Sequence, residues 1–156
     1  MRNIVVFIIS VAILILSGCS EGDIEAERAN VQLVLDQIIQ ANETEDMELI
    51  AKVTAHDDDI VIFGTSTADY HVGWDSFKES MERQFELFER TDISVRGQSI
   101  KVHRSGNVAW FSQVLDFDFS AHGQRFRFEG VRVTGVLEKR NSDWVAVQIH
   151  MSIPTT

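Results

Sequence analysis

The chain has one cysteine in 156 residues and few basic side chains, with 14 lysines and arginines against 24 aspartates and glutamates. A single cysteine excludes a disulfide within one chain, so the fold depends on its apolar core. The net charge of −10 argues against nucleic acid as a partner, because binding to phosphates needs clustered positive charge. The same charge argues against docking on anionic lipid through a basic face.

Several motifs that carry well-defined chemistry are also missing from the sequence. There is no glycine-rich loop before a helix to hold phosphate, no GxSxG, no HExxH and no EF-hand spacing. His71, His103 and His150 are too scattered to predict a zinc site. The run from His56 to Asp59 offers oxygen ligands, but consecutive residues do not all turn to one ion, which favours a solvated turn. The sequence therefore predicts neither a cofactor nor a metal.

The first eighteen residues have the pattern of an export signal. Arg2 gives a positive start, residues 4–16 form an apolar run too short for a stable membrane-spanning helix, and Leu16-Ser17-Gly18-Cys19 closes it. This ending resembles a bacterial lipobox, in which the signal is cut before the cysteine and the cysteine is acylated. The alternative is an ordinary secretory signal followed by a free thiol, which leaves the lone cysteine of an exported protein unexplained.

The lipobox resemblance implies a signal peptide at residues 1–18, a lipidated tether at residues 19–23 and one domain at residues 24–156. Cleavage leaves 138 residues, enough for a single core, and a net charge near −11 because Arg2 is lost. Acyl chains such as palmitate on Cys19 are then the expected membrane attachment. Ser20 follows the cysteine in place of the aspartate that retains such lipoproteins in the inner membrane. The resemblance thus implies the cell envelope, at the periplasmic face of the outer membrane of a Gram-negative cell.

The apolar pattern of the remaining chain predicts three helices followed by a strongly curved antiparallel sheet, an α+β fold with the helices on one side. Helical spacing marks residues 24–41, a shorter segment capped by Thr44, and a segment that starts at Asp75 or Ser76, with Ser76 and Glu79 as a capping box. Residues 60–63 form a brief strand, and residues 65–73 lack periodicity.

After Thr91 the sequence has the pattern of strands separated by turns, with apolar and polar residues alternating in each strand. Parity changes at Gly97 and Gly130 predict a bulge at each glycine. A five-residue turn, residues 139–143, joins the last two strands. The register that follows pairs Val133 with Ile149, Leu137 with Val145, Arg132 with His150, Asp116 with Arg127 and Asp118 with Arg125. A slip of two residues would keep the faces and change these partners.

Short motifs in this order are similar to the nuclear transport factor 2-like superfamily, and within it to SnoaL-like domains. They are Phe63-Gly64, Gly73-Trp74, residues 109–112, residues 132–137, and Trp144 followed by His150, Ser152 and Pro154. The resemblance covers residues 24–154 and implies a cone-shaped fold with a pocket at its open end. The superfamily includes ketosteroid isomerases, polyketide cyclases, dehydratases and binding proteins, so the fold does not settle the function.

The first functional hypothesis is that the pocket binds a small apolar or weakly acidic molecule. Arginine, histidine and hydroxyl groups donate hydrogen bonds to a carboxylate, and aromatic rings form an apolar wall. The alternation alone also allows this strand face to point outward or into a dimer, and ordinary core packing is an equal alternative for each aromatic ring. The predicted ligand contacts are Tyr70, Trp74, Trp110, Arg132, His150 and Ser152.

The second hypothesis is a lyase or isomerase of the ketosteroid isomerase or polyketide cyclase type, with His150 or Asp59 as its base. No position matches the catalytic pattern of the isomerase. The third is a non-catalytic structural or interaction lipoprotein whose own side chains fill the cavity. A homodimer through the sheet is expected, and either a second subunit or the helices should cover an aromatic patch formed by Phe117, Phe119, Phe126 and Phe128.

Overall fold

The computed structural model describes residues 21–154. The predicted signal peptide, the lipobox and Cys19 lie outside the described residues. None of the described helices is both long and apolar enough to cross a membrane. The elements run in the order α1 (Glu21–Thr44), α2 (Met47–Val53), β1 (Val61–Phe63), β2 (Tyr70–Val72), α3 (Trp74–Leu87), β3 (Phe88–Val102), β4 (Val108–Ala121), β5 (Gln124–Arg140) and β6 (Asp143–Ser152).

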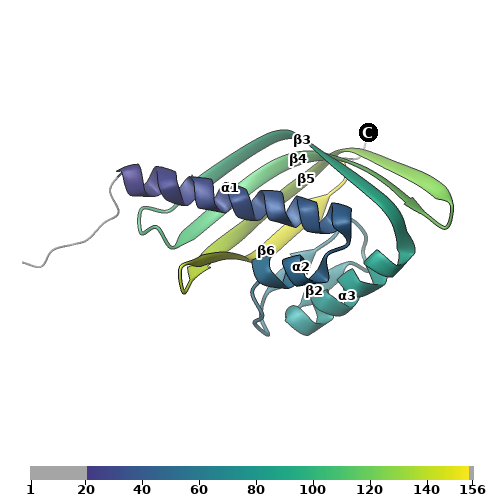
Figure 1. Cartoon of the computed structure of the whole chain (residues 1–156), viewed down its shortest axis with the longest axis horizontal. Coiled ribbons are helices and arrows are strands. Elements are labelled where there is room, and N and C mark those ends of the chain that lie inside the picture. The colour runs from purple at the N-terminus through teal and green to yellow at the C-terminus, as the bar shows by residue number, and fades with distance from the viewer. Residues whose placement is uncertain (1–20, 155–156) are drawn as a thin grey trace, which may run out of the picture.

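The six strands form one curved sheet in the order β2-β1-β6-β5-β4-β3, with α1 lying across one face (Figure 1). This confirms the predicted α+β class with three helices and a curved, mainly antiparallel sheet. One pair departs from the prediction, because β1 runs parallel to β6. The two strands are far apart in the chain, so no hairpin forces them to be antiparallel. Strand β2 falls in the stretch without periodicity, where three residues are too few to show alternation.

The core lies between the helices and the sheet face toward them, called here the inner face; the opposite side is the outer face. Apolar residues at helical spacing on α1 and α3 are buried against alternate residues of the strands, as the sequence pattern predicts. Buried residues of this core include Val31, Leu35, Phe77, Met81, Phe85, Phe111, Leu115, Val133, Leu137 and Trp144.

The helix starts differ from those predicted. Helix α1 begins at Glu21, three residues early, with Glu21 and Asp23 in the first turn, where the helix dipole favours acids. Helix α2 is capped by Asp46, whose carboxylate accepts the Leu49 N–H at 2.9 Å, and not by Thr44. Helix α3 begins at Trp74 after Gly73, so the predicted capping box at Ser76 is wrong.

Both predicted bulges are confirmed. The register between β3 and β4 shifts between Val95 and Gly97. At Gly130, which has φ = 70°, β5 has one more residue than β4, and the Gly130 N–H donates to Asp116 Oδ1 at 2.9 Å. Asp116 forms its ion pair with Arg96 at 2.5 Å.

The two ion pairs predicted beside the Gly130 bulge have different outcomes. The Asp118–Arg125 ion pair is confirmed, with Arg125 Nε 2.7 Å from Asp118 Oδ1. The register predicted for it is wrong, because Arg125 lies opposite Ser120. The predicted Asp116–Arg127 register is wrong, because the chain reverses in a two-residue turn, His122-Gly123, and not over residues 120–123, so Arg127 lies opposite Asp118.

The register predicted for the last hairpin is wrong. The strands are joined by a two-residue turn, Asn141-Ser142, with φ of 50° and 79°, as a type I′ hairpin requires. A further irregularity leaves Val147 unpaired in β6. Val133 therefore faces Met151 and Leu137 faces Ala146; Arg132 faces Ser152, and His150 faces Thr134. Val133 and Ile149 still share the inner face and are buried.

The hairpin of β4 and β5 extends beyond the helices (Figure 1). The aromatic patch predicted there is only partly covered within the chain. Phe88, at the end of α3, stacks on Phe119 with ring centroids 4.3 Å apart. Phe126 and Phe128 remain exposed.

Polar contacts fix α1 to the last hairpin. Glu27 accepts hydrogen bonds from Lys139 Nζ at 2.6 Å and from Trp144 Nε1 at 2.7 Å. The bond from the Lys139 ammonium is the main reason why the pKa of Glu27 is lowered, against partial burial, which raises it. One flank of α1 is thereby held on β5 and β6, and its other flank faces β3.

Candidate functional site

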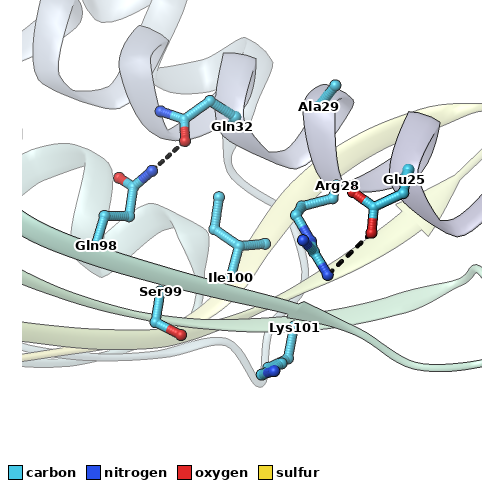
Figure 2. Close-up of a pocket in the computed structure, with 8 residues that line it drawn as sticks. All are labelled: Glu25, Arg28, Ala29, Gln32, Gln98, Ser99, Ile100 and Lys101. Atoms are coloured by element: carbon cyan, nitrogen blue, oxygen red, sulfur yellow. Dashed lines mark hydrogen bonds and ion pairs between the residues drawn. The ribbon is translucent and has the colours of Figure 1, made fainter.

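A groove of about 480 Å³ lies between the first half of α1 and the edge strand β3 (Figure 2). We call it the α1–β3 groove. Ile100 points from β3 into the groove toward α1, and Lys101 points to the opposite side of the strand. The groove is lined by Glu25, Arg28, Ala29, Gln32, Gln98, Ser99, Ile100 and Lys101.

Three glutamine amides connect this groove to the core. Gln32 donates to Asp36 Oδ1 at 2.7 Å, Gln98 donates to Gln32, and Gln113 donates to Gln98. The donors are assigned from the outer end of the chain, at Asp36, because a carboxylate accepts hydrogen bonds and each amide must then donate in turn. Gln113 lies on the inner face and is 6% exposed. A track of polar groups therefore runs from the rim of the groove into an otherwise apolar core.

Arg28 has spare hydrogen-bonding capacity inside the groove. Its Nη2 lies 3.3 Å from Glu25 Oε1, which is long for a charge-assisted bond. Its Nε is buried and has no hydrogen-bond partner within the described part of the chain. The Nε–H and Nη2–H groups form one edge of the planar guanidinium, and this edge matches the two oxygens of a carboxylate. The arrangement is suited to binding an acidic group.

Five of the six predicted ligand residues lie on the outer face of the sheet, away from the groove. One cross-strand row follows the pairing of all six strands. Within it, Phe63 stacks on Tyr70 with ring centroids 4.8 Å apart and meets His150 edge-on at 5.7 Å. The row consists of Tyr70, Phe63, His150, Thr134, Ser112 and Ser99.

The neighbouring rows hold the other three of these five residues. Trp110 pairs with Val136 and Lys101, and Arg132 lies between Val114 and Ser152. A shallow hollow of about 520 Å³ on this face includes Trp110, Thr134 and Gln148 in its lining. The outer face thus combines exposed aromatic and aliphatic side chains with hydroxyl and amide groups.

Trp74, the sixth predicted ligand residue, lies apart from the others at the start of α3. Its ring stacks on His56 at 4.1 Å, and its backbone N–H donates to Asp57 O at 3.0 Å. The Asp57 carboxylate in turn pairs with Arg140 at 2.6 Å. Trp74 and the acidic run at residues 56–59 therefore connect the loop before β1 to α3 and to the last hairpin.

Sequence reasoning missed the residues that define the groove. Arg28 and Gln32 are four apart on α1, which places them on one helix face, but nothing in the sequence shows that this face meets β3. Gln113 carried the clearest signal, because it occupies an inward position in a strand whose other inward residues are apolar.

Comparison with known proteins identifies the family. The model of the SnoaL-like domain matches residues 31–156. This chain belongs to the SnoaL-like domain family. Comparison of the SnoaL-like domain with curated proteins finds no significant match.

Solved structures confirm the nuclear transport factor 2-like fold of this SnoaL-like domain. A superfamily protein from Salmonella enterica serovar Typhimurium LT2 has a TM-score of 0.76 and 17% identity, covering 85% of this chain and 94% of that one. A candidate dehydratase from Streptomyces avermitilis has a TM-score of 0.75 and 13% identity, covering 85% and 99%. A candidate scytalone dehydratase from Novosphingobium aromaticivorans has a TM-score of 0.74 and 13% identity, covering 87% and 89%. At these identities the likeness concerns the fold alone.

Proposed function

We propose that this SnoaL-like domain binds a small, weakly acidic molecule in the α1–β3 groove. The observation that carries the proposal is the buried Nε of Arg28, which lacks a hydrogen-bond partner among residues 21–154. Leaving a buried donor of a charged group unpaired is unfavourable. A carboxylate would satisfy this donor once the Arg28 side chain shifts away from Glu25 to present its Nε–H to the groove. Ile100 and Ala29 supply apolar contacts, and the glutamine track supplies polar ones.

Binding is favoured over catalysis because of the acids and bases that the groove contains. General acid–base catalysis needs a base held close to the substrate with a tuned pKa. Among residues 21–154, Glu25 is the only carboxyl group that lines the groove, it is exposed and paired with Arg28, and no histidine lines the groove. His150 is exposed on the outer face and Asp59 in the turn before β1. Two similar structures are described as dehydratases. The described lining of this groove offers no acid or base free of an ion-pair partner for such a reaction.

The Nε–H resonance of Arg28 in a ¹⁵N-labelled full chain in detergent tests this proposal. The resonance is assigned by its loss in the Arg28→Met variant. We expect small carboxylic acids to shift it saturably, because the carboxylate accepts a bond from that N–H. The Nε–H of Arg83, an arginine similarly paired on α3, should stay unchanged. A resonance that no carboxylate moves would refute binding at this site.

We also propose that acylated Cys19 anchors the domain at the periplasmic face of the outer membrane. The lipobox-like sequence supports this, and the first described element begins two residues after the cysteine. In a Gram-negative host fed a clickable palmitate, the wild-type chain should carry label and sediment with outer membranes. Cys19→Ser should carry none. Label on that variant, or unlabelled wild-type chain in the soluble fraction, would contradict the anchor.

The outer face fits a second copy of this chain better than it fits a small molecule. Contiguous exposed apolar surface marks interaction sites, and a two-fold axis would bring the same rows of both copies together. In this proposal Tyr70, Arg132, His150 and Ser152 contact a second copy of the chain instead of a small ligand. Five large apolar side chains on this face are exposed by 38% or more: Phe63, Tyr70, Val72, Trp110 and Val114.

Sedimentation of the full chain in detergent tests the self-association. We expect the mass of two chains for the wild type and of one chain for Trp110→Glu, because a charge on this face is costly to bury in an interface. Leu33→Glu is the matched control, since Leu33 is 60% exposed on α1. A Trp110→Glu chain that still sediments as a pair would exclude this face.

A further inference from the structure

We infer that the ligand of the α1–β3 groove is a zwitterion, with an ammonium group next to its carboxylate, as in a free α-amino acid. The inference rests on the proposed binding of an acidic molecule in this groove. It adds the chemical class, and its basis is the pairing of Glu25 with Arg28.

The charges inside the groove balance each other. Lys101 lines its margin but points to the other side of β3, as Figure 2 shows, so Glu25 and Arg28 are the charges that face a ligand. A simple anion would gain the Arg28 guanidinium and at the same time approach the Glu25 carboxylate. A simple cation would gain the Glu25 carboxylate and at the same time approach the Arg28 guanidinium. Neither kind of ion satisfies both side chains.

The ion pair between Glu25 and Arg28 is weak enough for a ligand to separate it. Its 3.3 Å separation exceeds the 2.7–2.9 Å that is typical of a strong charge-assisted bond, and the two side chains are 43% and 59% exposed. An exposed pair of this kind contributes little to stability. A ligand carboxylate on the Nε–Nη2 edge of Arg28 would displace Glu25, and the freed carboxylate would need a new cation. An ammonium group on the same ligand supplies one at the required place.

The rest of the groove sets the size and polarity of the ligand. Ile100 occupies the space between Arg28 and the amide pair of Gln32 and Gln98 (Figure 2). A short aliphatic side chain would lie on Ile100 and Ala29, with the amides beside it. A volume of about 480 Å³ is large enough for a free amino acid. Valine is therefore a suitable probe.

Calorimetric titration of the full chain in detergent with three matched compounds tests the inference. Valine carries both charges, 3-methylbutanoate is valine without the ammonium, and valinamide is valine without the carboxylate. We expect both truncated compounds to bind at least about tenfold more weakly than valine, because each leaves one charged side chain unpaired.

Two variants assign the preference to the ion pair. Glu25→Gln should reduce valine affinity to the level of 3-methylbutanoate, because the partner of the ammonium is gone. Arg28→Met should abolish binding of both acids. Glu79→Gln and Arg83→Met, which alter an exposed ion pair on α3, should leave all three affinities unchanged.

The outcomes separate this inference from the proposed function. If 3-methylbutanoate binds as tightly as valine and Glu25→Gln changes neither, the ligand is a simple acid and the zwitterion inference is wrong. If valine and 3-methylbutanoate both fail to bind and to move the Arg28 resonance, the inference and the proposed acid site fall together.

Discussion

The indole Nε1 of Trp144 donates a hydrogen bond to Glu27 Oε2 across the interface between β6 and α1, at 2.7 Å. Lys139 holds the other oxygen of the same carboxylate at 2.6 Å. One glutamate thus satisfies a buried indole and an ammonium, and it ties the long helix to the last hairpin. The α1–β3 groove lies on the other flank of α1.

Replacing this carboxylate should weaken the fold. Glu27→Gln is expected to lower the free energy of unfolding by about 1–2 kcal/mol, because the Lys139 ammonium loses its charged partner. Urea denaturation followed by tryptophan fluorescence measures the change. Glu86→Gln, an exposed acid on α3, is the control and should change little.

The same contact predicts a pH dependence. The pKa of Glu27 is lowered in the folded chain, with the Lys139 hydrogen bond as the main cause, so the unfolded chain takes up its proton first. The contribution of Glu27 is therefore complete above the unfolded pKa of about 4.3 and is lost as the pH falls through the lower folded value. Urea midpoints between pH 3 and pH 7 should show a smaller acid-side loss for Glu27→Gln than for the wild type. Parallel curves would contradict this.

Two strand glycines should respond in opposite directions to alanine. A Cβ at Gly135 would lie 2.5 Å from the backbone oxygen of Gln148 and 2.6 Å from the Phe111 ring. Gly135→Ala should therefore destabilise the fold by about 1–3 kcal/mol, since backbone and core must shift. At Gly97 nothing lies within 4 Å, and alanine should be neutral or stabilising by up to about 1 kcal/mol. Urea midpoints of the two variants, each compared with the wild type, measure both changes in stability.

The turn between β5 and β6 contains a residue that is poorly matched to its conformation. Ser142 has φ = 79°, a left-handed value that a type I′ turn requires and that glycine adopts most easily. Ser142→Gly is expected to stabilise the fold by about 0.5–1 kcal/mol, whereas Ser142→Ala should not. A lower urea midpoint for the glycine variant would show that the turn has another conformation.

The groove arginine should reduce stability in the absence of ligand. Its buried Nε is unpaired within residues 21–154, so an apolar side chain of similar length removes a penalty. Arg28→Met is expected to match or exceed the urea midpoint of the wild type by up to about 1 kcal/mol while it loses ligand binding. Leu35→Ala, a core truncation on the same helix, should lower the midpoint strongly.

The order of the elements other than β2, and most of the core, were predictable from local patterns. The stripe of Phe77, Met81 and Phe85 and the glycine bulges follow from spacing and parity, which depend on neighbouring residues alone. The register of the last hairpin was not predictable, because Asn141-Ser142 reads as polar turn whether two or five residues reverse the chain. One further residue left unpaired at Val147 then moved Trp144 and Ala146 to the inner face.

The groove could not be predicted for a different reason. Arg28 and Gln98 are 70 positions apart in the chain, and their meeting depends on how α1 lies across the sheet. Glu27 helps to fix that placement, and by sequence it is one more acid near the start of a helix. A pattern that repeats every two or four residues carries no information about such a contact.

Helix α1 contains 24 residues, so its axis is about 36 Å long. The α1–β3 groove lies at its first turns, and the tip of the β4–β5 hairpin lies beyond its last (Figure 1). Phe126 and Phe128 are exposed near that tip. If the proposed acyl anchor on Cys19 exists, the groove would lie close to the bilayer, and the length of α1 would keep these exposed rings away from it.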